Sequence, residues 1–468
     1  MMNPDKLNSH EKLTPASKRA FLLLYGLALL IRLVLAFAFG TQAPKIVDAI
    51  DYDGLATRLL ESGNYASESG ELTSLRPPLY AGFLAAIYFL FGTHNYLAVS
   101  VVQSVLSLMT AMLGQNVGST LMGPRAGWTV GVILAFYPSL LAFNCLTLSE
   151  TLFTFWFVLA VLLSVRFQAQ PSWRLAILLG ISLGLGALTR SVLWVCVPPV
   201  FLCLFVASAD QWYLRAAKLS VALLVFGAVL APWAWRNTNL QKTFTLIDVM
   251  GGRNVMMGNY EYTPLERSWA TISDVTGERA WHRVLANDTP NYSSQTQGQI
   301  DKLAMKYGVK YFFAHPTQSA IRSVVRFFNF WQLERELIAG AHQGLWGPVP
   351  KIGLGLLALV ILGGYASVIL PAIGGFFIAG VPWRQHGLLL LWLALPCAVH
   401  TIAFAHSRYH LPLVPIIACY AAPFWLSILD RDVSKLKNAA WWGGPFVWLL
   451  ILAWVRELIM VDLAVFMK

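Results

Sequence analysis

The sequence predicts an all-α protein that crosses a membrane many times, and three observations support this prediction. Of its 468 residues, 57% are hydrophobic and 12% are charged, whereas a soluble domain is about 45–50% apolar and about 25% charged. The mean hydropathy is +0.59. Several apolar runs, among them 219–235, 387–404 and 411–429, approach the roughly 20 residues that a membrane-spanning helix needs. We therefore predict a polytopic protein with about 11 transmembrane helices.

The N-terminal 19 residues are polar and basic, with Lys18 and Arg19 directly before a largely apolar run over residues 20–39. Lys and Arg gather in short cytoplasmic segments, so we predict a cytoplasmic N-terminus over residues 1–19. A cleaved signal peptide would have a shorter apolar region that ends in small residues at a cleavage site. The run over 20–39 is therefore expected to be a retained first span that leads to the outer face.

Residues 40–96 are then expected to form a first outer loop. Within this loop, the apolar run Leu79–Phe91 is about 13 residues long, too short to cross a bilayer, and we predict an interfacial or re-entrant helix there. If this run does not cross, every later short loop predicted to be inside carries Lys or Arg, as the positive-inside rule requires. If it did cross, all later loops would be inverted.

The remaining spans follow in order from this topology. They are expected at 97–117, 127–141, 151–165, 175–189, 192–206, 219–235, 352–380, 387–404, 411–429 and 440–454. Residues 20–236 would thus form a transmembrane catalytic module that includes the first outer loop, and 237–350 a polar external segment. Residues 351–468 would contain the C-terminal transmembrane helices. No internal repeat is visible, which disfavours a transporter built from inverted halves.

The formal charge of +11 indicates orientation more than a partner. A nucleic-acid-binding protein would need its Lys and Arg on one solvated face, but here they lie mostly at the ends of apolar runs. No nucleic-acid partner is therefore expected. The five cysteines all lie inside apolar runs, without a CxxC pair or the spacing of a zinc site. We predict that they pack as small hydrophobic residues.

Three aspartates, Asp48, Asp51 and Asp53, open the first outer loop. Positions three or four apart share a helix face, so Asp48 and Asp51 are expected to point the same way with Tyr52 beside them. Two carboxylates on one face repel, which raises one pKa and suits a general base. The alternative is a solvated, acidic helix start whose carboxylates favour the helix dipole.

Basic residues are predicted to face the same outer compartment. Arg76 precedes a stiff Pro-Pro pair, and its fork of donors suits the two oxygens of a lipid phosphate. Arg190, Arg236 and Arg408 lie at the predicted outer ends of spans, where ionisable groups are costly and usually functional. Glu150 begins an inward span and adds a further acid. The alternatives are that each arginine reaches the headgroups on its own and that Glu150 only compensates a helix dipole.

At these positions the sequence resembles the membrane-embedded C-type glycosyltransferases that use polyprenyl-phosphate sugars. This class includes the family 39 protein mannosyltransferases and the lipid A aminoarabinose transferase. The resemblance covers the chain from the first span to about Pro415 and consists of short elements in the family's order. These elements are Asp48–Ala56, Arg76–Tyr80, Leu148–Glu150, Leu188–Arg190, Pro232–Asn237, Gly258–Asn259 and Arg408–Tyr409 with Pro412 and Pro415.

This resemblance implies a fold of many spans with juxtamembrane helices in the first outer loop. It also implies a transferase, in which Asp48 activates the acceptor and basic residues hold the carrier phosphate. Asp51 adds an acid next to Tyr52, so the choice of base between Asp48 and Asp51 stays open. The expected sites are: catalytic, Asp48, Asp51 and Glu150; donor phosphate, Arg76, Arg190 and Arg408; substrate pocket, Tyr52, Asp53, Tyr80, Arg236, Asn259, His406 and Tyr409.

The predicted function is inverting transfer of a sugar from an undecaprenyl-type phosphate to a glycan, lipid or protein acceptor on the outer face of the inner membrane. No cofactor is obligatory in this reaction, because the phosphate leaving group needs only charge stabilisation. The acid cluster could nonetheless hold Mg²⁺ or Ca²⁺. Two alternatives remain: a carrier or flippase for a lipid-linked sugar, and an O-antigen polymerase or ligase.

Overall fold

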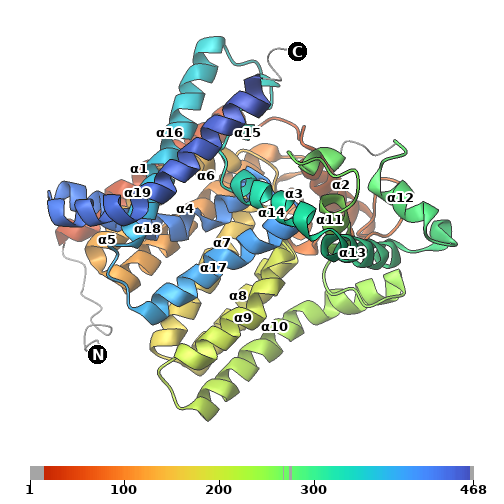
Figure 1. The fold of residues 1–468 in the computed structure, drawn as a ribbon, viewed down its shortest axis with the longest axis horizontal. Coiled ribbons are helices and arrows are strands. Elements are labelled where there is room, and N and C mark those ends of the chain that lie inside the picture. The colour runs from red at the N-terminus through yellow and green to blue at the C-terminus, as the bar shows by residue number, and fades with distance from the viewer. Residues whose placement is uncertain (1–14, 267, 273–276, 464–468) are drawn as a thin grey trace.

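The computed structural model describes residues 15–266, 268–272 and 277–463, which form helices joined mostly by short loops (Figure 1). No β-strand occurs in this part of the chain, which confirms the predicted all-α class. Most of the predicted cytoplasmic N-terminus, residues 1–14, lies outside the described residues. The same holds for residues 464–468 at the end of the C-terminal section.

Eight helical segments within the described residues are long and apolar enough to cross a bilayer. They lie where long spans were predicted, although their ends differ by several residues. They are α1 (Pro15–Phe39), α4 (Tyr96–Met122), α7 (Glu150–Ala169), α10 (Trp212–Gln241), α16 (Lys351–Phe376), α17 (Trp383–Ile402), α18 (Val414–Leu429) with the 3₁₀ turn Ser407–Leu413 before it, and α19 (Val433–Glu457).

Shorter helices occupy the other three predicted spans. These are α5 (Pro124–Phe136) with the short α6 (Pro138–Phe143), α8 (Trp173–Thr189) and α9 (Val192–Ala207). The total of about 11 spans stays a prediction, because these helices are too short to count by length alone. The expected interfacial helix is α3 (Pro78–Phe91), whose 14 residues are likewise fewer than a span requires.

The first span carries a buried arginine, Arg32, that donates hydrogen bonds to backbone carbonyls at the break between α5 and α6. Pro138 has no N–H, so the carbonyl of Leu134, four residues earlier, loses its normal partner. Arg32 supplies donors instead, to Leu134 O at 3.3 Å and to Ala135 O at 2.7 Å. The side chain of Arg32 is almost fully buried. Since a buried carbonyl without a partner is costly, Arg32 locks α1 to the corner from which the chain continues to α7.

Two groups of short helices cover the ends of the spans that were predicted to be outer ends. The first outer loop forms α2 (Val47–Ser62), which packs on α3 around Tyr52, Leu55 and Tyr80. The external segment forms α11 (Gly251–Gly258), α12 (Trp281–Asn287), α13 (Gln297–Ala314), α14 (Pro316–Phe330) and α15 (Glu336–His342). Helix α11 packs on α13, and α14 packs on the outer end of α17. The site lies between these two groups.

The end of α10 and the burial of the cysteines can be compared with the sequence predictions. The span expected over 219–235 is longer than predicted, since α10 continues to Gln241 and Arg236 therefore lies within the helix. The five cysteines are free thiols, of which three are buried and two partly buried. This confirms that they pack as small hydrophobic residues.

Candidate active site

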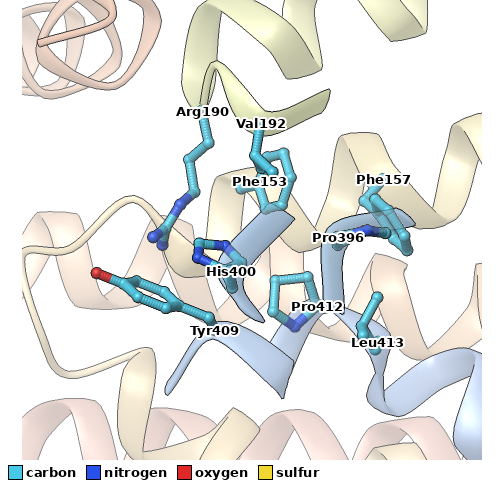
Figure 2. A pocket seen from close by; sticks show the side chains of 9 residues that line it. All are labelled: Phe153, Phe157, Arg190, Val192, Pro396, His400, Tyr409, Pro412 and Leu413. Carbon is cyan, nitrogen blue, oxygen red and sulfur yellow. The ribbon is translucent and has the colours of Figure 1, made fainter. Parts of the chain in front are cut away.

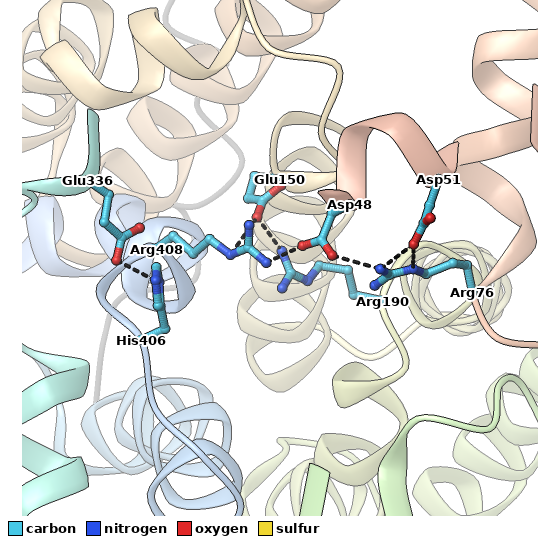
Figure 3. A network of polar contacts seen from close by, with 8 residues as sticks. All are labelled: Asp48, Asp51, Arg76, Glu150, Arg190, Glu336, His406 and Arg408. Atoms are coloured by element: carbon cyan, nitrogen blue, oxygen red, sulfur yellow. Dashed lines mark hydrogen bonds and ion pairs between the residues drawn. The ribbon is translucent and has the colours of Figure 1, made fainter. Parts of the chain in front are cut away.

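Asp48 and Asp51 share a face of α2, as predicted, and both contact Arg76 (Figure 3). An Arg76 Nη atom lies 2.7 Å from Asp48 Oδ1 and 2.7 Å from Asp51 Oδ2. Pro77 and Pro78 follow Arg76 and start α3, so the arginine leaves a stiff corner of the first outer loop. The predicted common face of Asp48 and Asp51 is therefore confirmed, and Arg76 lies close to it; the roles of the three residues stay predictions.

The network continues to residues that are distant in sequence. Asp48 Oδ2 accepts from Arg408, which precedes α18 in the turn Ser407–Leu413. Arg408 Nε lies 3.7 Å from Oε1 of Glu150, the first residue of α7. The same Glu150 oxygen lies 2.8 Å from Arg190, which follows the end of α8. Alternating charges thus connect four parts of the fold (Figure 3).

Asp48 is more acidic than predicted. Burial alone would raise the pKa of its carboxyl, but Arg408 and Arg76 lower it by more, so the net pKa lies well below its usual value. Repulsion between the two carboxylates was expected to raise the pKa of one of them, and for Asp48 the shift is in the opposite direction. The physical reason is the attraction of Arg408, and then of Arg76, for the Asp48 carboxylate.

Two polar atoms at the centre of the network lack hydrogen-bond partners. Glu150 Oε2 is buried and accepts no hydrogen bond from the described residues, and Arg408 Nε–H donates none. Its nearest carboxylate oxygen, at 3.7 Å, is too distant for a hydrogen bond. Buried polar groups are rarely left without partners, so an unpaired donor and an unpaired acceptor in one network are candidate contacts for a polar ligand.

A narrow, mostly apolar cavity adjoins Arg190. Figure 2 shows the arginine reaching toward the rings of Tyr409 and His400. The Arg190 guanidinium lies 5.2 Å from the centroid of the Tyr409 ring, which stacks on His400 with centroids 4.2 Å apart. The other lining residues come from α7, α9, α17 and the turn before α18. They are Phe153, Phe157, Val192, Pro396, Pro412 and Leu413.

The predicted pocket residue His406 has a partner that the sequence reasoning missed. His406 Nε2 lies 2.6 Å from Oε1 of Glu336, and Ser407 Oγ donates to the same oxygen at 2.9 Å. Burial by itself raises the pKa of Glu336, but His406 and Arg408 lower it below its usual value. Glu336 begins α15 in the external segment. No sequence spacing connects it with a turn about 70 residues later, so only the fold reveals the pair.

Three predicted pocket residues lie outside the network and hold helices together instead. Asp53 accepts from Tyr88 at 2.5 Å and from Tyr96 at 3.2 Å. Tyr80 is buried and donates to Gln103 at 3.0 Å. The side-chain amide of Asn259 donates to the carbonyl oxygens of Val255 and Ile402. A further predicted pocket residue, Tyr52, is buried at the edge of the network, and the Arg76 guanidinium lies 5.7 Å from its ring centroid.

Arg236 lines a separate and larger cavity of about 530 Å³. Its guanidinium donates to the carbonyls of Thr73 and Tyr65 at 3.0 and 3.1 Å and lies 4.5 Å from the Trp233 ring centroid. The remaining lining comes from Trp233 of α10, from α2 and α3, and from the loop between α2 and α3. Besides Trp233, it consists of Leu59, Gly63, Asn64, Tyr65, Leu72, Pro78, Leu79 and Gly82. This cavity is apolar with one cationic wall, and Pro78 is part of that lining.

Asp248, a further acid missed by the sequence reasoning, lies near Arg76. Its backbone neighbour Val249 donates to Ser74 O at 3.1 Å, which ties the segment to the first outer loop. Its carboxyl accepts from the Met250 N–H at 3.3 Å and hydrogen-bonds with Ser191. Burial raises the pKa of Asp248 to about 6, despite the opposing hydrogen bonds.

This raised pKa predicts a pH-dependent stability difference between the wild type and the variant Asp248→Asn. The folded protein binds the proton more tightly than the unfolded chain, so the stabilisation is complete below the ordinary pKa of 3.8 and is lost as pH rises through about 6. From about pH 4 to pH 7 we expect the wild type to lose on the order of 2 kcal/mol relative to the variant. Thermal unfolding, followed by a thiol-reactive dye that detects the five cysteines, measures this difference. A difference that does not change with pH would contradict the prediction.

The acid cluster does not fit a divalent cation in this arrangement. No group of three His, Cys, Asp or Glu residues in the described ranges lies close enough to hold a metal ion. Asp48, Asp51 and Glu150 each face an arginine, whose positive charge opposes a cation at the same oxygens.

A family model and several solved structures resemble this chain. The family described as dolichyl-phosphate-mannose-protein mannosyltransferase matches residues 75–235, a range that includes Arg76, Glu150 and Arg190. The oligosaccharyltransferase AglB of Archaeoglobus fulgidus, in complex with an inhibitory peptide and a dolichol-phosphate, shares the fold with a TM-score of 0.52. These findings confirm the predicted resemblance to membrane-embedded C-type glycosyltransferases.

The structural matches are distant in sequence. AglB is 14% identical, and the alignment covers 95% of this chain and 55% of that chain. The apo oligosaccharyltransferase of the same organism gives a TM-score of 0.53 at 14% identity, with 93% and 54% covered. ArnT from Cupriavidus metallidurans gives 0.42 at 12% identity, with 87% and 78% covered. The chain thus spans about half the length of the archaeal proteins. No curated relative matches it.

Proposed function

We propose that the protein is an inverting glycosyltransferase that moves a sugar from a polyprenyl-phosphate carrier to an acceptor. The observation that carries this proposal is the pair of open groups at the centre of the network. Arg408 Nε–H is a free donor for a phosphate oxygen, and Glu150 Oε2 is a free acceptor for a hydroxyl or amine. A reaction between an anionic leaving group and a protonated nucleophile needs both.

In the proposed reaction the acceptor hydroxyl or amine attacks the anomeric carbon of the sugar. The new glycosidic bond forms as the bond between that carbon and the carrier phosphate oxygen breaks, and the configuration inverts. The phosphate leaves with the bonding electron pair, and Arg408, Arg190 and Arg76 stabilise its added negative charge. The acceptor's proton passes to Asp48, with Glu150 orienting the nucleophile.

Ion pairing with Arg408 and Arg76 lowers the Asp48 pKa, so Asp48 is a weak base before the donor binds. The donor phosphate competes for the same guanidinium groups. When these arginines form ion pairs with the phosphate, they stabilise the Asp48 carboxylate less, and the Asp48 pKa rises toward its usual value. We propose that this exchange makes Asp48 basic enough only when the donor is present, which limits unproductive chemistry. Asp51 keeps its contact with Arg76 and orients that arginine.

We assign the 530 Å³ cavity between α2, α3 and α10 to the first isoprene units of the carrier. Its walls are mostly apolar, and Arg236 adds a cation whose hydrogen-bond acceptors among the described residues are neutral oxygen atoms. The segment from Arg76 to Pro78 separates this cavity from the network, so a phosphate near Arg76 and an isoprene chain in the cavity would be neighbours.

Filling this cavity is expected to weaken donor binding without unfolding the protein. A Cβ atom at Gly82 would meet nothing within 4 Å, so Gly82→Leu can be accommodated. The leucine would occupy space that the isoprene chain needs. We expect KM for the donor to rise about tenfold or more, which corresponds to a loss of about 1.4 kcal/mol of binding free energy. The change in kcat should be smaller. Gly26→Leu is the control, because a Cβ there also meets nothing within 4 Å and lies in α1. Equal KM values for both variants would contradict the assignment.

The active site is proposed to face the outer side of the inner membrane. This orientation is supported by the positions of Arg125, Arg174 and Arg431 at the ends of helices opposite to the network, in loops predicted to be inside. The acceptor would then be a glycan, a lipid or a protein exposed on that outer face.

The test uses purified protein, a panel of radiolabelled polyprenyl-phosphate sugars and a membrane extract as the source of acceptors. Transfer of label to an acceptor, or slow hydrolysis of one donor, is the expected result. Binding and movement of intact donor across liposomes without cleavage would favour the carrier instead. Inversion is checked by the anomeric configuration of the product, since a retained configuration would exclude direct displacement.

A further inference from the structure

The external helix α14 buries charged residues and exposes apolar ones, the opposite of a surface helix in a soluble domain. Its buried face carries Arg322 and Arg326, which are 4% and 1% exposed. Its opposite face presents Ile321, Val324 and Phe327 to the surroundings, at 52%, 58% and 45% exposure. A surface helix normally buries its apolar stripe. An exposed apolar face of this kind marks contact with another apolar phase.

The buried arginines explain why α14 is held in this orientation. Arg322 donates to the backbone carbonyls of Tyr260 and Thr263 at 3.0 and 2.8 Å. Arg326 donates to the carbonyl of Ile402 at 2.7 Å and to that of Gly258. These carbonyls lie at ends of helices or in loops, where they lack partners within a helix. Rotating α14 to bury its apolar face would remove an arginine donor from each of these four carbonyls.

Helix α13 extends the same surface and adds positive charge. Met305, Val309 and Phe313 recur every four residues along it and are exposed, with Phe313 at 74%. Three exposed lysines, Lys302, Lys306 and Lys310, run along the edge of this stripe. The only acid in α13 is Asp301, which is partly buried, and α14 contains none. Apolar residues flanked by lysines are typical of helices that lie in a lipid headgroup region.

The exposed apolar face of α14 could be covered by a bilayer or by a soluble partner protein, and the position of α14 favours the bilayer. Arg326 fixes it to Ile402, the last residue of α17, which is itself a candidate span with an exposed outer end. The exposed face of α14 therefore lies next to the level at which α17 leaves the hydrocarbon. We propose that the consecutive helices α13 and α14 insert their exposed apolar residues into the outer leaflet and that the lysines of α13 bind anionic lipid headgroups.

This insertion would act on the active site through a short connection. Ile402 accepts from Arg326, and only a few residues separate it from His406 and Arg408. A pair of helices anchored in the leaflet would hold this turn at a fixed depth, where the chemistry of a lipid-linked donor takes place. The proposed insertion is independent of the proposed transfer reaction, because it concerns the surface of α13 and α14 alone.

The test measures depth with an environment-sensitive fluorophore on single cysteines in the full-length protein, reconstituted into vesicles. The five native cysteines are first replaced, and labels are placed by Val324→Cys and Phe313→Cys. Asn287→Cys is the control, because Asn287 is exposed on α12 of the same external segment. We expect labels at 324 and 313 to be quenched by lipids brominated in the acyl chain and protected from iodide, and the label at 287 to show the reverse.

Each other outcome contradicts the proposal. Quenching of the 324 label by iodide would place this face in water, and protection from both quenchers would show that protein covers it. The headgroup assignment has its own comparison. Vesicles with anionic lipid should quench the 313 label more strongly than zwitterionic vesicles, and replacing the three lysines by Gln should remove that difference. An unchanged difference in the Gln variant would overturn the role of the lysines.

Discussion

Replacing Asp48 by Asn is expected to reduce kcat for sugar transfer by about 10² to 10⁴, the range for loss of a general base. Asn keeps the size of the side chain and can still accept from one arginine, but it cannot take a proton from the acceptor. Donor binding should persist or tighten, because Arg408 and Arg76 lose a competing anion. Transfer rate and donor affinity, measured separately with a radiolabelled donor, check both parts.

The matched control is Asp53→Asn, five residues further along the same helix. Asp53 accepts from Tyr88 and Tyr96 and has no contact with the three arginines of the network. We expect this variant to be less stable by about 1–3 kcal/mol, the cost of a weakened buried hydrogen bond to a charged group, with kcat nearly unchanged. If Asp48→Asn transferred sugar at the wild-type rate, Asp51→Asn would be the next test of the base, because that choice is open. If neither variant lost activity, no aspartate of this triad would be the base.

Replacing Arg408 by Gln is expected to lower both activity and stability. Arg408 contacts Asp48 and approaches Glu150, which is only 2% exposed, so its removal leaves buried carboxylates with less compensation. Breaking a buried ion pair in this way costs about 3–5 kcal/mol. Loss of a donor to the developing phosphate charge should lower kcat by about 10² to 10³. Thermal unfolding and single-turnover transfer measure the two effects.

A double variant separates the two effects of Arg408. Combining Arg408→Gln with Asp48→Asn removes the charge that the arginine compensates, so stability should partly recover while activity stays low. Arg125→Gln is the control for loss of an arginine ion pair, because its pair with Asp430 is largely exposed. That change should cost at most about 1 kcal/mol. Additive stability losses in the double variant would contradict the proposed coupling of Arg408 to Asp48.

Much of the fold followed from the sequence because the bilayer restricts a chain so strongly. A segment inside the hydrocarbon must satisfy its own backbone hydrogen bonds, so apolar runs of sufficient length become helices wherever they pack. The proximity of Asp48, Asp51 and Arg76 was also predictable. All three belong to one loop, and helix spacing determines which aspartates share a face. Helix ends were harder. The extension of α10 to Gln241 depends on packing that no local pattern encodes.

The limits of the sequence are clearest at Asp48 and Asp53. Repulsion between neighbouring acids suggested a raised pKa for one of the pair, but the pKa of Asp48 is lowered, chiefly by Arg408, which lies 360 residues away in sequence. Asp53 was predicted to line the substrate pocket, yet its helix face turns toward Tyr88 and Tyr96. Glu336 and Asp248 had no sequence signal at all, because each acts through a partner in another part of the chain.

The sequence alone thus determined that this protein is a helical membrane protein with acids and arginines gathered at one side. Composition, run length and helix periodicity are local properties, and the bilayer converts them directly into structure. The tertiary structure decided which charges meet, which carboxylate is held ionised, and which helix turns its apolar face outward. Those features depend on distances between residues that are remote in sequence, and electrostatic and packing energies respond to such distances rather than to order along the chain.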